Sequence, residues 1–369
     1  MPTKLQPVSC IASFSGNSDS VYAIDAYWKC GHIPCSRLKK TGKSKRKVAP
    51  GNNNVDEEVI TMVSGSKDQN MYIWDVKISP TPSSKEELQC TAIPKTKLAG
   101  HAGEIFALEI MSASSIPTSS PDRDSTVSRH PVVDVVSAGD ITVRGWNLMS
   151  GVQVTALHGH TGNVVCLRVR GRRVFSGSVD TTLRSFNLDA GKAMHVFRGH
   201  KNVVNCIDVN DTEVYSGSDD MTIIKWSRAT GDAVAALEGH TDAVQALQLD
   251  EKGDYLYSGS SDCTIRVWNT RTSKTIKVFK GHTEAIKCLQ VVGGLCFSGS
   301  KDKTIRVWRI DTGDCTAILE GHTDTIHSIK VFDNILYSGG ADKLIKLWDC
   351  RHLIAYASRP WWKKMLGMS

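Results

Sequence analysis

Residues 281–308 read GHTEAIKCLQVVGGLCFSGSKDKTIRVW, and they contain the landmarks on which the prediction of the fold rests. It opens with a Gly-His pair and a short apolar segment. Ser-Gly-Ser then leads to Asp302 and, six residues later, to Trp308. The apolar segments are rich in Ile, Val and Thr and are bounded by Gly and Asp, which is typical of short β-strands. We therefore expect this stretch to form strands.

The same landmarks recur along most of the chain, which indicates an internal repeat. Gly-His pairs stand at 100–101, 159–160, 199–200, 239–240, 281–282 and 321–322. Each unit also has an Asp followed six residues later by a bulky aromatic residue. These pairs are Asp68 with Trp74, Asp140 with Trp146, Asp180 with Phe186, Asp220 with Trp226, Asp262 with Trp268, Asp302 with Trp308 and Asp342 with Trp348. Seven units of about four short strands each predict an all-β fold, a seven-bladed β-propeller.

These repeats resemble those of the WD40-repeat family over roughly residues 8–350. They are also similar to the repeats of F-box/WD40 substrate receptors, although this chain contains no F-box. The resemblance implies a structural tetrad in each blade, which in the fourth unit is His200, Ser216, Asp220 and Trp226. The histidines that it implies are His101, His160, His200, His240, His282 and His322, and the tryptophans are Trp74, Trp146, Trp226, Trp268, Trp308 and Trp348.

Three units depart from the pattern. Asn17 stands where the first histidine should be, the turn of the second unit is one residue short, and Phe186 replaces the third tryptophan. Because a lost partner leaves buried polar groups unpaired, we expect these three blades to be looser than the others.

The repeat also predicts how the ring closes. Residues 8–16 resemble the outer strand at 274–281, so we expect the N-terminal strand to complete the blade of residues 326–349 and remove exposed sheet edges. Residues 353–357 are an alternative occupant of that outer position. We expect residues 1–350 to form the propeller and residues 351–369 a C-terminal tail. Flexible loop insertions are predicted at about 30–58 and 112–131, and the resemblance implies that both emerge on the bottom face.

The net charge of +7 comes from one place. Residues 37–47 carry seven basic residues and no acid, so the rest of the chain is balanced. Three interpretations of this run stay open: a solvated loop, a nuclear localisation signal, or a contact for nucleic acid, acidic lipid or acidic protein. The chain shows no signal peptide and no apolar run long enough to span a bilayer, so we expect a cytoplasmic or nuclear protein without a transmembrane segment.

Other candidate sites are weak. The tetrad explains the repeated His, Ser and Asp residues, and no single nucleophile stands beside a base, so we expect neither an enzyme nor a bound cofactor. Cys30, His32 and Cys35 supply three zinc ligands where a structural site needs four, and whether they bind metal is left open. Thr41-Gly-Lys-Ser44 resembles the end of a phosphate-binding loop, but Arg37 stands where the first glycine is required. Trp361 and Trp362 in the tail form a docking peptide or a membrane-surface anchor, or they pack on the last blade.

The resemblance places partner binding on the top face, around the mouth of the central channel. Two positions in each blade point there, and the candidates that stand out are Tyr22, Lys67, Phe106, Lys287, Lys301 and His327. We expect a basic sector with an aromatic edge that binds an acidic or phosphorylated peptide. The alternative is that these lysines are solvated side chains on the rim of the propeller and bind no partner.

The sequence thus predicts a non-enzymatic protein-interaction scaffold or adaptor, including a substrate adaptor in ubiquitin or signalling complexes. It would be a monomeric propeller within a larger complex. The alternative is a propeller associated with nucleic acid or ribonucleoprotein and anchored by residues 37–47. Loss of binding at moderate salt would separate the two.

Overall fold

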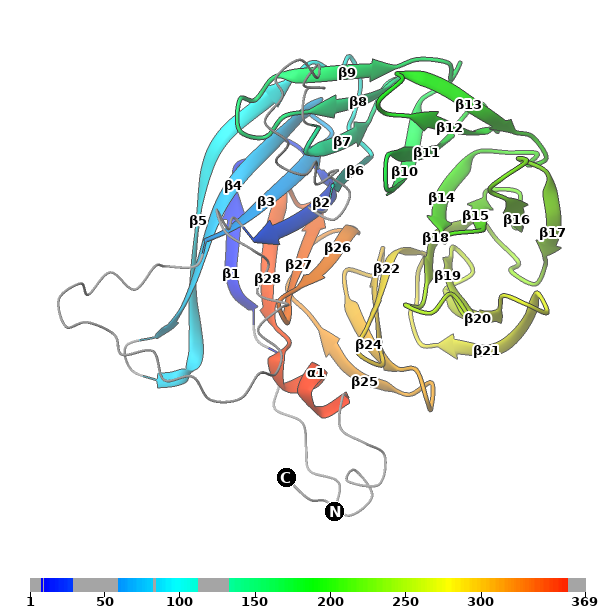
Figure 1. The fold of residues 1–369 in the computed structure, drawn as a ribbon. Coiled ribbons are helices and arrows are strands. Elements are labelled where there is room, and N and C mark those ends of the chain that lie inside the picture. The colour runs from blue at the N-terminus through cyan, green and yellow to red at the C-terminus, as the bar shows by residue number, and fades with distance from the viewer. Residues whose placement is uncertain (1–7, 9, 29–58, 82–83, 112–132, 358–369) are drawn as a thin grey trace, which may run out of the picture.

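The computed structural model describes residues 8, 10–28, 59–81, 84–111 and 133–357. In this part of the chain, the strands form seven antiparallel sheets of four strands each, which stand as blades around a ring (Figure 1). The predicted seven-bladed β-propeller is therefore confirmed.

Six blades are built from consecutive strands. Blade 1 comprises β2 (Val21–Trp28), β3 (Val59–Ser66), β4 (Asn70–Thr81) and β5 (Ser84–Ala99). Blade 2 comprises β6 (Ala107–Ile110), β7 (Val135–Ala138), β8 (Val143–Trp146) and β9 (Gln153–Leu157). Blade 3 comprises β10 (Val164–Arg170), β11 (Arg173–Ser178), β12 (Leu183–Asn187) and β13 (Lys192–Phe197). Blade 4 comprises β14 (Val204–Val209), β15 (Glu213–Ser218), β16 (Ile223–Ser227) and β17 (Ala233–Leu237). Blade 5 comprises β18 (Val244–Leu249), β19 (Tyr255–Ser260), β20 (Thr264–Asn269) and β21 (Lys274–Lys280). Blade 6 comprises β22 (Ile286–Val292), β23 (Leu295–Ser300), β24 (Ile305–Arg309) and β25 (Cys315–Leu319).

Blade 7 joins the two ends of the chain. It comprises β26 (Ile326–Phe332), β27 (Ile335–Gly340), β28 (Leu344–Asp349) and, as its outer strand, β1 (Cys10–Ser15). Phe14 pairs with Ile345 in this antiparallel ladder. The expected closure by the N-terminal strand is confirmed, and it removes two open sheet edges.

The core lies between neighbouring blades. In one cluster, Tyr215 of blade 4 packs with Val244 and Trp268 of blade 5, and all three side chains are fully buried. The two blades approach each other closely at Gly217, where an added Cβ would lie 2.5 Å from Cγ1 of Val244. The Ser-Gly-Ser landmark is therefore a packing requirement, since the second strand touches the next blade through its glycine.

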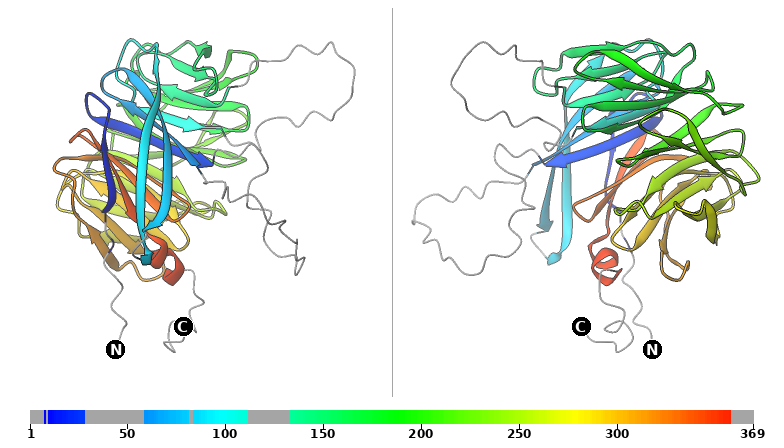
Figure 2. Two further views of the ribbon diagram at one scale, coloured as in Figure 1. Left: turned by 90° about the vertical axis from the view of Figure 1, so that its left-hand side faces the viewer. Right: turned by 45° about the vertical axis from the view of Figure 1, so that its right-hand side comes forward.

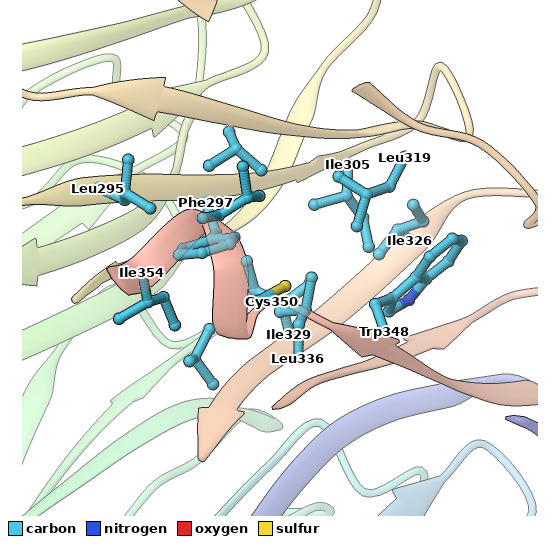
Figure 3. Close-up of a cluster of buried hydrophobic side chains, with 13 residues drawn as sticks. Leu295, Phe297, Ile305, Leu319, Ile326, Ile329, Leu336, Trp348, Cys350 and Ile354 are labelled. Atoms are coloured by element: carbon cyan, nitrogen blue, oxygen red, sulfur yellow. The ribbon is translucent and has the colours of Figure 1, made fainter. Parts of the chain in front are cut away.

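The segment proposed as a competing outer strand, Leu353 to Ala357, forms a helix, so that alternative is wrong. Helix α1 (Arg351–Ala357) follows β28 directly. Leu353 and Ile354 are buried in a cluster with Leu295 and Phe297 of blade 6, as Figure 3 shows for Ile354. Among the described residues this is the one helix, and none that is long and apolar enough to cross a membrane is found there.

Blade 1 has an extended outer hairpin. Strand β5 has 16 residues and passes beside β1, as both views in Figure 2 indicate. Ile78, Leu88 and Cys90 of this hairpin pack against the hydrophobic cluster that contains Trp74 and Leu347. The hairpin therefore covers the junction where the ring closes.

Candidate functional site

The histidines of the Gly-His pairs sit inside hydrogen-bonded tetrads. In blade 4, Nε1–H of Trp226 donates to Oγ of Ser216 at 2.8 Å, and this Oγ lies 2.7 Å from Nε2 of His200. Nδ1 of His200 lies 2.7 Å from Oδ2 of Asp220. Blades 5 and 6 repeat this arrangement with distances of 2.7 and 2.8 Å.

The tetrad of blade 7 is complete although this blade is assembled from both ends of the chain. Nε1–H of Trp348 donates to Oγ of Ser338 at 2.9 Å, and this Oγ lies 2.7 Å from Nε2 of His322. Nδ1 of His322 lies 2.8 Å from Oδ2 of Asp342. Trp348 is only 1% exposed, and in the ladder with β1 it lies opposite Cys10. The indole therefore belongs to the hydrogen-bonded core of the closing blade and is not available to a partner.

These groups bind one another and stiffen the turns. Burial acts to raise the pKa of Asp220, but hydrogen bonds from Thr222, Lys201 and His200 outweigh it and hold that pKa below its usual range. The hydroxyl of Ser216 is completely buried and bonded to both Trp226 and His200, so it cannot reach a substrate. The Ser-His-Asp grouping therefore stabilises the fold of this blade.

Blade 1 builds its turn differently. Oγ–H of Ser64 donates to Oδ1 of Asn17 at 3.1 Å, but Asn17 makes no hydrogen bond to Asp68 among the described residues. Oδ2 of Asp68 instead accepts from the amide and hydroxyl of Ser18 and from the hydroxyl of Tyr72. Burial opposes these bonds, which nevertheless lower the pKa of Asp68 to about 2.

Blades 2 and 3 each lack one tetrad bond. In blade 2, Nδ1 of His101 lies 3.4 Å from Oδ2 of Asp140, beyond a good hydrogen bond for these atoms, and burial lowers the pKa of His101 to about 4. In blade 3, Phe186 has no N–H, so Ser176 bonds only the histidine of its blade.

Three of the predicted partner-binding residues form an aromatic cluster at the channel mouth. The rings of Tyr22 and Phe106 are stacked with centroids 5.5 Å apart, and His327 meets Tyr22 edge-on at 4.7 Å. Burial lowers the pKa of His327 to about 4, and the charge of Lys287 lowers it further. His327 is therefore neutral at pH 7, and the expected basic sector gains an aromatic side chain there in place of a cation.

A polar arc continues from this cluster around the mouth. Nζ of Lys287 lies 3.2 Å from Oε1 of Gln245. Oδ1 of Asp219 in turn accepts from Nε2 of Gln245 at 3.4 Å and from Nδ2 of Asn205 at 2.6 Å. Burial lowers the pKa of Lys287, while the charge of Asp219 acts in the opposite direction.

The other two lysines lie further out on the rim, in the blades on either side of blade 7. Nζ of Lys301 lies 3.5 Å from Oε2 of Glu284, and both side chains are exposed. Lys67 is exposed and lies near Asp19, whose pKa is lowered first by the amide of Ser20 and also by Lys67. The sequence did not show that each rim lysine has a carboxylate beside it.

Comparison with known proteins places the chain in a family. The profile described as "WD domain, G-beta repeat" matches residues 151–187, 191–227, 231–269, 273–309 and 313–349. This chain belongs to the WD40-repeat family. The five matches correspond to the repeats that keep the histidine and the full turn, whereas the first two units, which depart from the pattern there, are not matched.

The structural comparison agrees. The WD40 propeller is similar to the crystal structure of the WD40 beta propeller domain of Doa1, with a TM-score of 0.68 and 18% sequence identity. The match covers 92% of this chain and 96% of that one. At this identity the likeness concerns the fold alone. None of the curated proteins matches the chain in sequence.

A belt of polar side chains lines the wall of the channel of the WD40 propeller below its mouth. Each innermost strand contributes one residue three positions after its mouth residue. The seven are Asp25, Glu109, Arg168, Asp208, Gln248, Gln290 and Lys330. They line a cavity of about 420 Å³. Sequence reasoning missed this belt, although a polar residue at that position in all seven units was visible.

The belt links every blade to the next. Oxygens of Asp25, Glu109, Asp208, Gln248 and Gln290 accept from backbone amides of the neighbouring innermost strand. Two ion pairs complete the circle, Arg168 with Asp208 at 3.3 Å and Lys330 with Asp25 at 2.8 Å. Burial raises the pKa of Glu109 to about 7, although the nearby Arg168 acts to lower it.

The remaining predicted sites lie outside the described residues. They are Cys30, His32 and Cys35, residues 41–44, the basic run 37–47, and Trp361 with Trp362. Among the described residues, no group of three or more His, Cys, Asp or Glu side chains is arranged to hold a metal ion. The nine described cysteines are free thiols, of which Cys166 and Cys206 are buried between blades.

Proposed function

We propose that this WD40 propeller is a non-enzymatic scaffold that binds a peptide of a partner protein across its channel mouth. The observation that carries the proposal is the continuous arc from Phe106 through Tyr22 and His327 to Lys287. Rigid aromatic side chains next to a partly desolvated cation are the features that concentrate binding energy in protein interfaces. The family fold supports the coarser statement, because WD40 propellers typically act as protein-interaction scaffolds.

The charge pattern favours an acidic or phosphorylated residue in the peptide. Lys287 is half-buried and has a neutral amide, Gln245, as its hydrogen-bond partner, so an arriving anion would gain a charge-assisted bond. The pair between Lys301 and Glu284 is exposed, and such pairs contribute little, so Lys301 can turn to a partner at small cost.

The opposite half of the rim carries three exposed apolar side chains. The turn residues Ile141, Val179 and Met221 of blades 2, 3 and 4 are exposed by 49%, 45% and 46%. Together with the aromatic cluster they favour a peptide of mixed character. Its acidic part would lie over blades 6, 7 and 1, and its apolar part over blades 2 to 4.

Proximity labelling with the intact chain tests this proposal. The variant Lys67→Glu/Lys287→Glu/Lys301→Glu is compared with Lys192→Glu/Lys252→Glu/Lys274→Glu, which makes the same charge change at exposed lysines away from the mouth. We expect specific partners to disappear with the first variant and to remain with the second, while both keep the melting temperature of the intact chain. An unchanged partner list with the first variant would overturn the proposal.

Two finer statements are also proposals. A role as a substrate adaptor in ubiquitin or signalling complexes follows only from the likeness of the repeats to those of F-box/WD40 receptors. The association with nucleic acid depends on residues 37–47, which lie outside the described chain, and no described residue favours it. Partners that are lost when residues 37–47 are deleted, and kept in the lysine variant, would favour nucleic acid.

A further inference from the structure

The turn between β10 and β11 concentrates arginine at the end of blade 3 opposite the channel mouth. Residues 168–173 read RVRGRR, so four of six residues are arginine. Gly171 has a φ of 63°, which allows a tight turn and brings Arg170 opposite Arg173 in the ladder. Two of the four arginines have their own acids: Arg168 pairs with Asp208 in the channel, and Arg172 makes two bonds to Oδ1 of Asp189, at 2.9 and 2.6 Å.

Blade 4 adds a further arginine beside this turn. Nη1 of Arg228 donates to the carbonyls of Asn210 and Asp211 at 3.2 and 3.1 Å, and its guanidinium carbon lies 5.8 Å from the centroid of the buried Phe175 ring. These contacts hold Arg228 in place with its side chain only 17% exposed. Burial lowers the pKa of Arg228, and the charges of Arg173 and Arg170 lower it further.

The cluster carries an excess of positive charge. Oδ1 of Asp211 lies 3.4 Å from Nε of Arg170 and 3.8 Å from Nη1 of Arg228, and its side chain is 83% exposed. Arg173 has no ion-pair partner among the described residues. Three guanidinium groups therefore share one loosely held carboxylate, which leaves two positive charges unneutralised. Bringing like charges together costs free energy, and an anion that bridges them offsets this cost.

We propose that Arg170, Arg173 and Arg228 form a second binding site, on the bottom face, for the dianionic phosphate of a phosphorylated side chain in a partner protein. The two unneutralised charges match a phosphate dianion better than a single carboxylate. Guanidinium groups also bind phosphate oxygens in pairs, which a lysine cannot do. This site is separate from the channel mouth and does not depend on the function proposed there.

The surroundings favour a single phosphate group over an extended polyanion. The neighbouring Arg172 is already neutralised by Asp189, and Asp211 adds a carboxylate beside Arg170 and Arg228. A membrane surface or a nucleic acid would meet these acids as well as the arginines. One phosphate at the end of a side chain would meet only Asp211, whose exposed carboxylate Arg170 and Arg228 already share.

Titration of the full chain with a short phosphoserine peptide tests the site, with the arginine side-chain Nε–H resonances as the readout. We expect saturable shifts for a few arginines, and these resonances should be assigned to Arg170, Arg173 and Arg228 by single Arg→Lys substitutions. Arg173→Ala should weaken binding about tenfold, as expected for the loss of a charge-assisted bond. The matched control Arg172→Ala removes an arginine from the same turn that is already paired, and should weaken binding less than threefold (about 0.6 kcal/mol).

Further arms separate the alternatives. An aspartate peptide that binds as tightly as the phosphoserine peptide would overturn the preference for phosphate. Vesicles with phosphoinositide lipids that bind while the peptide does not would show a membrane site instead. Lys287→Glu at the channel mouth should leave phosphopeptide binding at the cluster unchanged. Loss of the arginine shifts in this variant would mean that the peptide binds at the mouth, which contradicts the inference.

Discussion

Nζ of Lys330 lies 2.8 Å from Oδ1 of Asp25, so an ion pair joins the last innermost strand of the propeller to the first. The two residues are 305 positions apart in the chain, and both line the channel. The pair closes the inside of the ring, while the ladder between β1 and β28 closes the outside.

Removing the charge of Lys330 should destabilise the propeller. Among the described residues, Lys330→Met leaves the buried carboxylate of Asp25 with only the amides of Ala26 and Ile110 as hydrogen-bond partners, so we expect a loss of about 1–3 kcal/mol in the free energy of unfolding. Urea denaturation measures this loss. The control Lys343→Met changes an exposed lysine that donates to the carbonyl of Ser18 and lies near Asp19, and should cost less than about 0.5 kcal/mol. Equal effects of the two substitutions would contradict a role for the pair in closure.

The belt should also make stability depend on pH. The pKa of Glu109 is raised by burial from 4.5 to about 7, so between these values the folded state holds a proton that the unfolded state has lost. The contribution of Glu109 to stability is therefore greatest below pH 4.5 and is lost as the pH rises to about 7. Glu109→Gln should remove this slope, because the amide of Gln does not titrate. The amide oxygen can still accept from the backbone N–H of Val169, so the contact between the blades is kept. Parallel curves of unfolding free energy against pH for the two proteins would refute the prediction.

The tetrad serines offer a matched comparison. Ser216→Ala in blade 4 removes the partner of both Trp226 and His200, whereas Ser176→Ala in blade 3 removes the partner of His160 alone, because Phe186 has no N–H. Each orphaned buried group costs about 1–3 kcal/mol, so the blade 4 variant should lose more stability. Chemical denaturation of both variants measures the difference, and a larger loss for Ser176→Ala would contradict this account.

The predicted looseness of the early blades can be measured by amide hydrogen exchange. In blade 1, Asn17 makes no hydrogen bond to Asp68 among the described residues, and in blade 2, Nδ1 of His101 lies 3.4 Å from Oδ2 of Asp140. In blades 4 to 7 the corresponding histidine and aspartate form a short hydrogen bond. We expect amides of β3 and β7 to exchange faster than those of β15 and β19, since exchange reports local opening. Uniform protection of all four strands would show that the missing bonds do not matter.

Several features could be predicted because they depend on residues close together in the chain. The turn between Asp302 and Trp308 and the Gly-His pair before it fall within one unit, and seven such units fixed the number of blades. The repeat also predicted closure. Residues 8–16 resemble the outer strand at 274–281, which favoured them for the outer position of the last blade over residues 353–357.

Other features could not be read from the repeat. Leu353 and Ile354 look like strand residues in sequence, but they pack as a helix because a hydrophobic surface of blades 6 and 7 is present beside them. His327 and Lys287 both appeared cationic, yet their proximity at the mouth and their burial leave His327 neutral.

The fold, the blade register and the closure of the ring could be predicted from the repeats, because strand formation and turn hydrogen bonds are local and repeat seven times. Which charges meet depends on how the blades pack in space. Three examples involve residues of different blades. Lys330 pairs with Asp25, Glu109 is desolvated between blades, and Arg228 lies near Arg170. Electrostatic free energy depends on distance and burial in space, and neither is encoded in the spacing of residues along the chain.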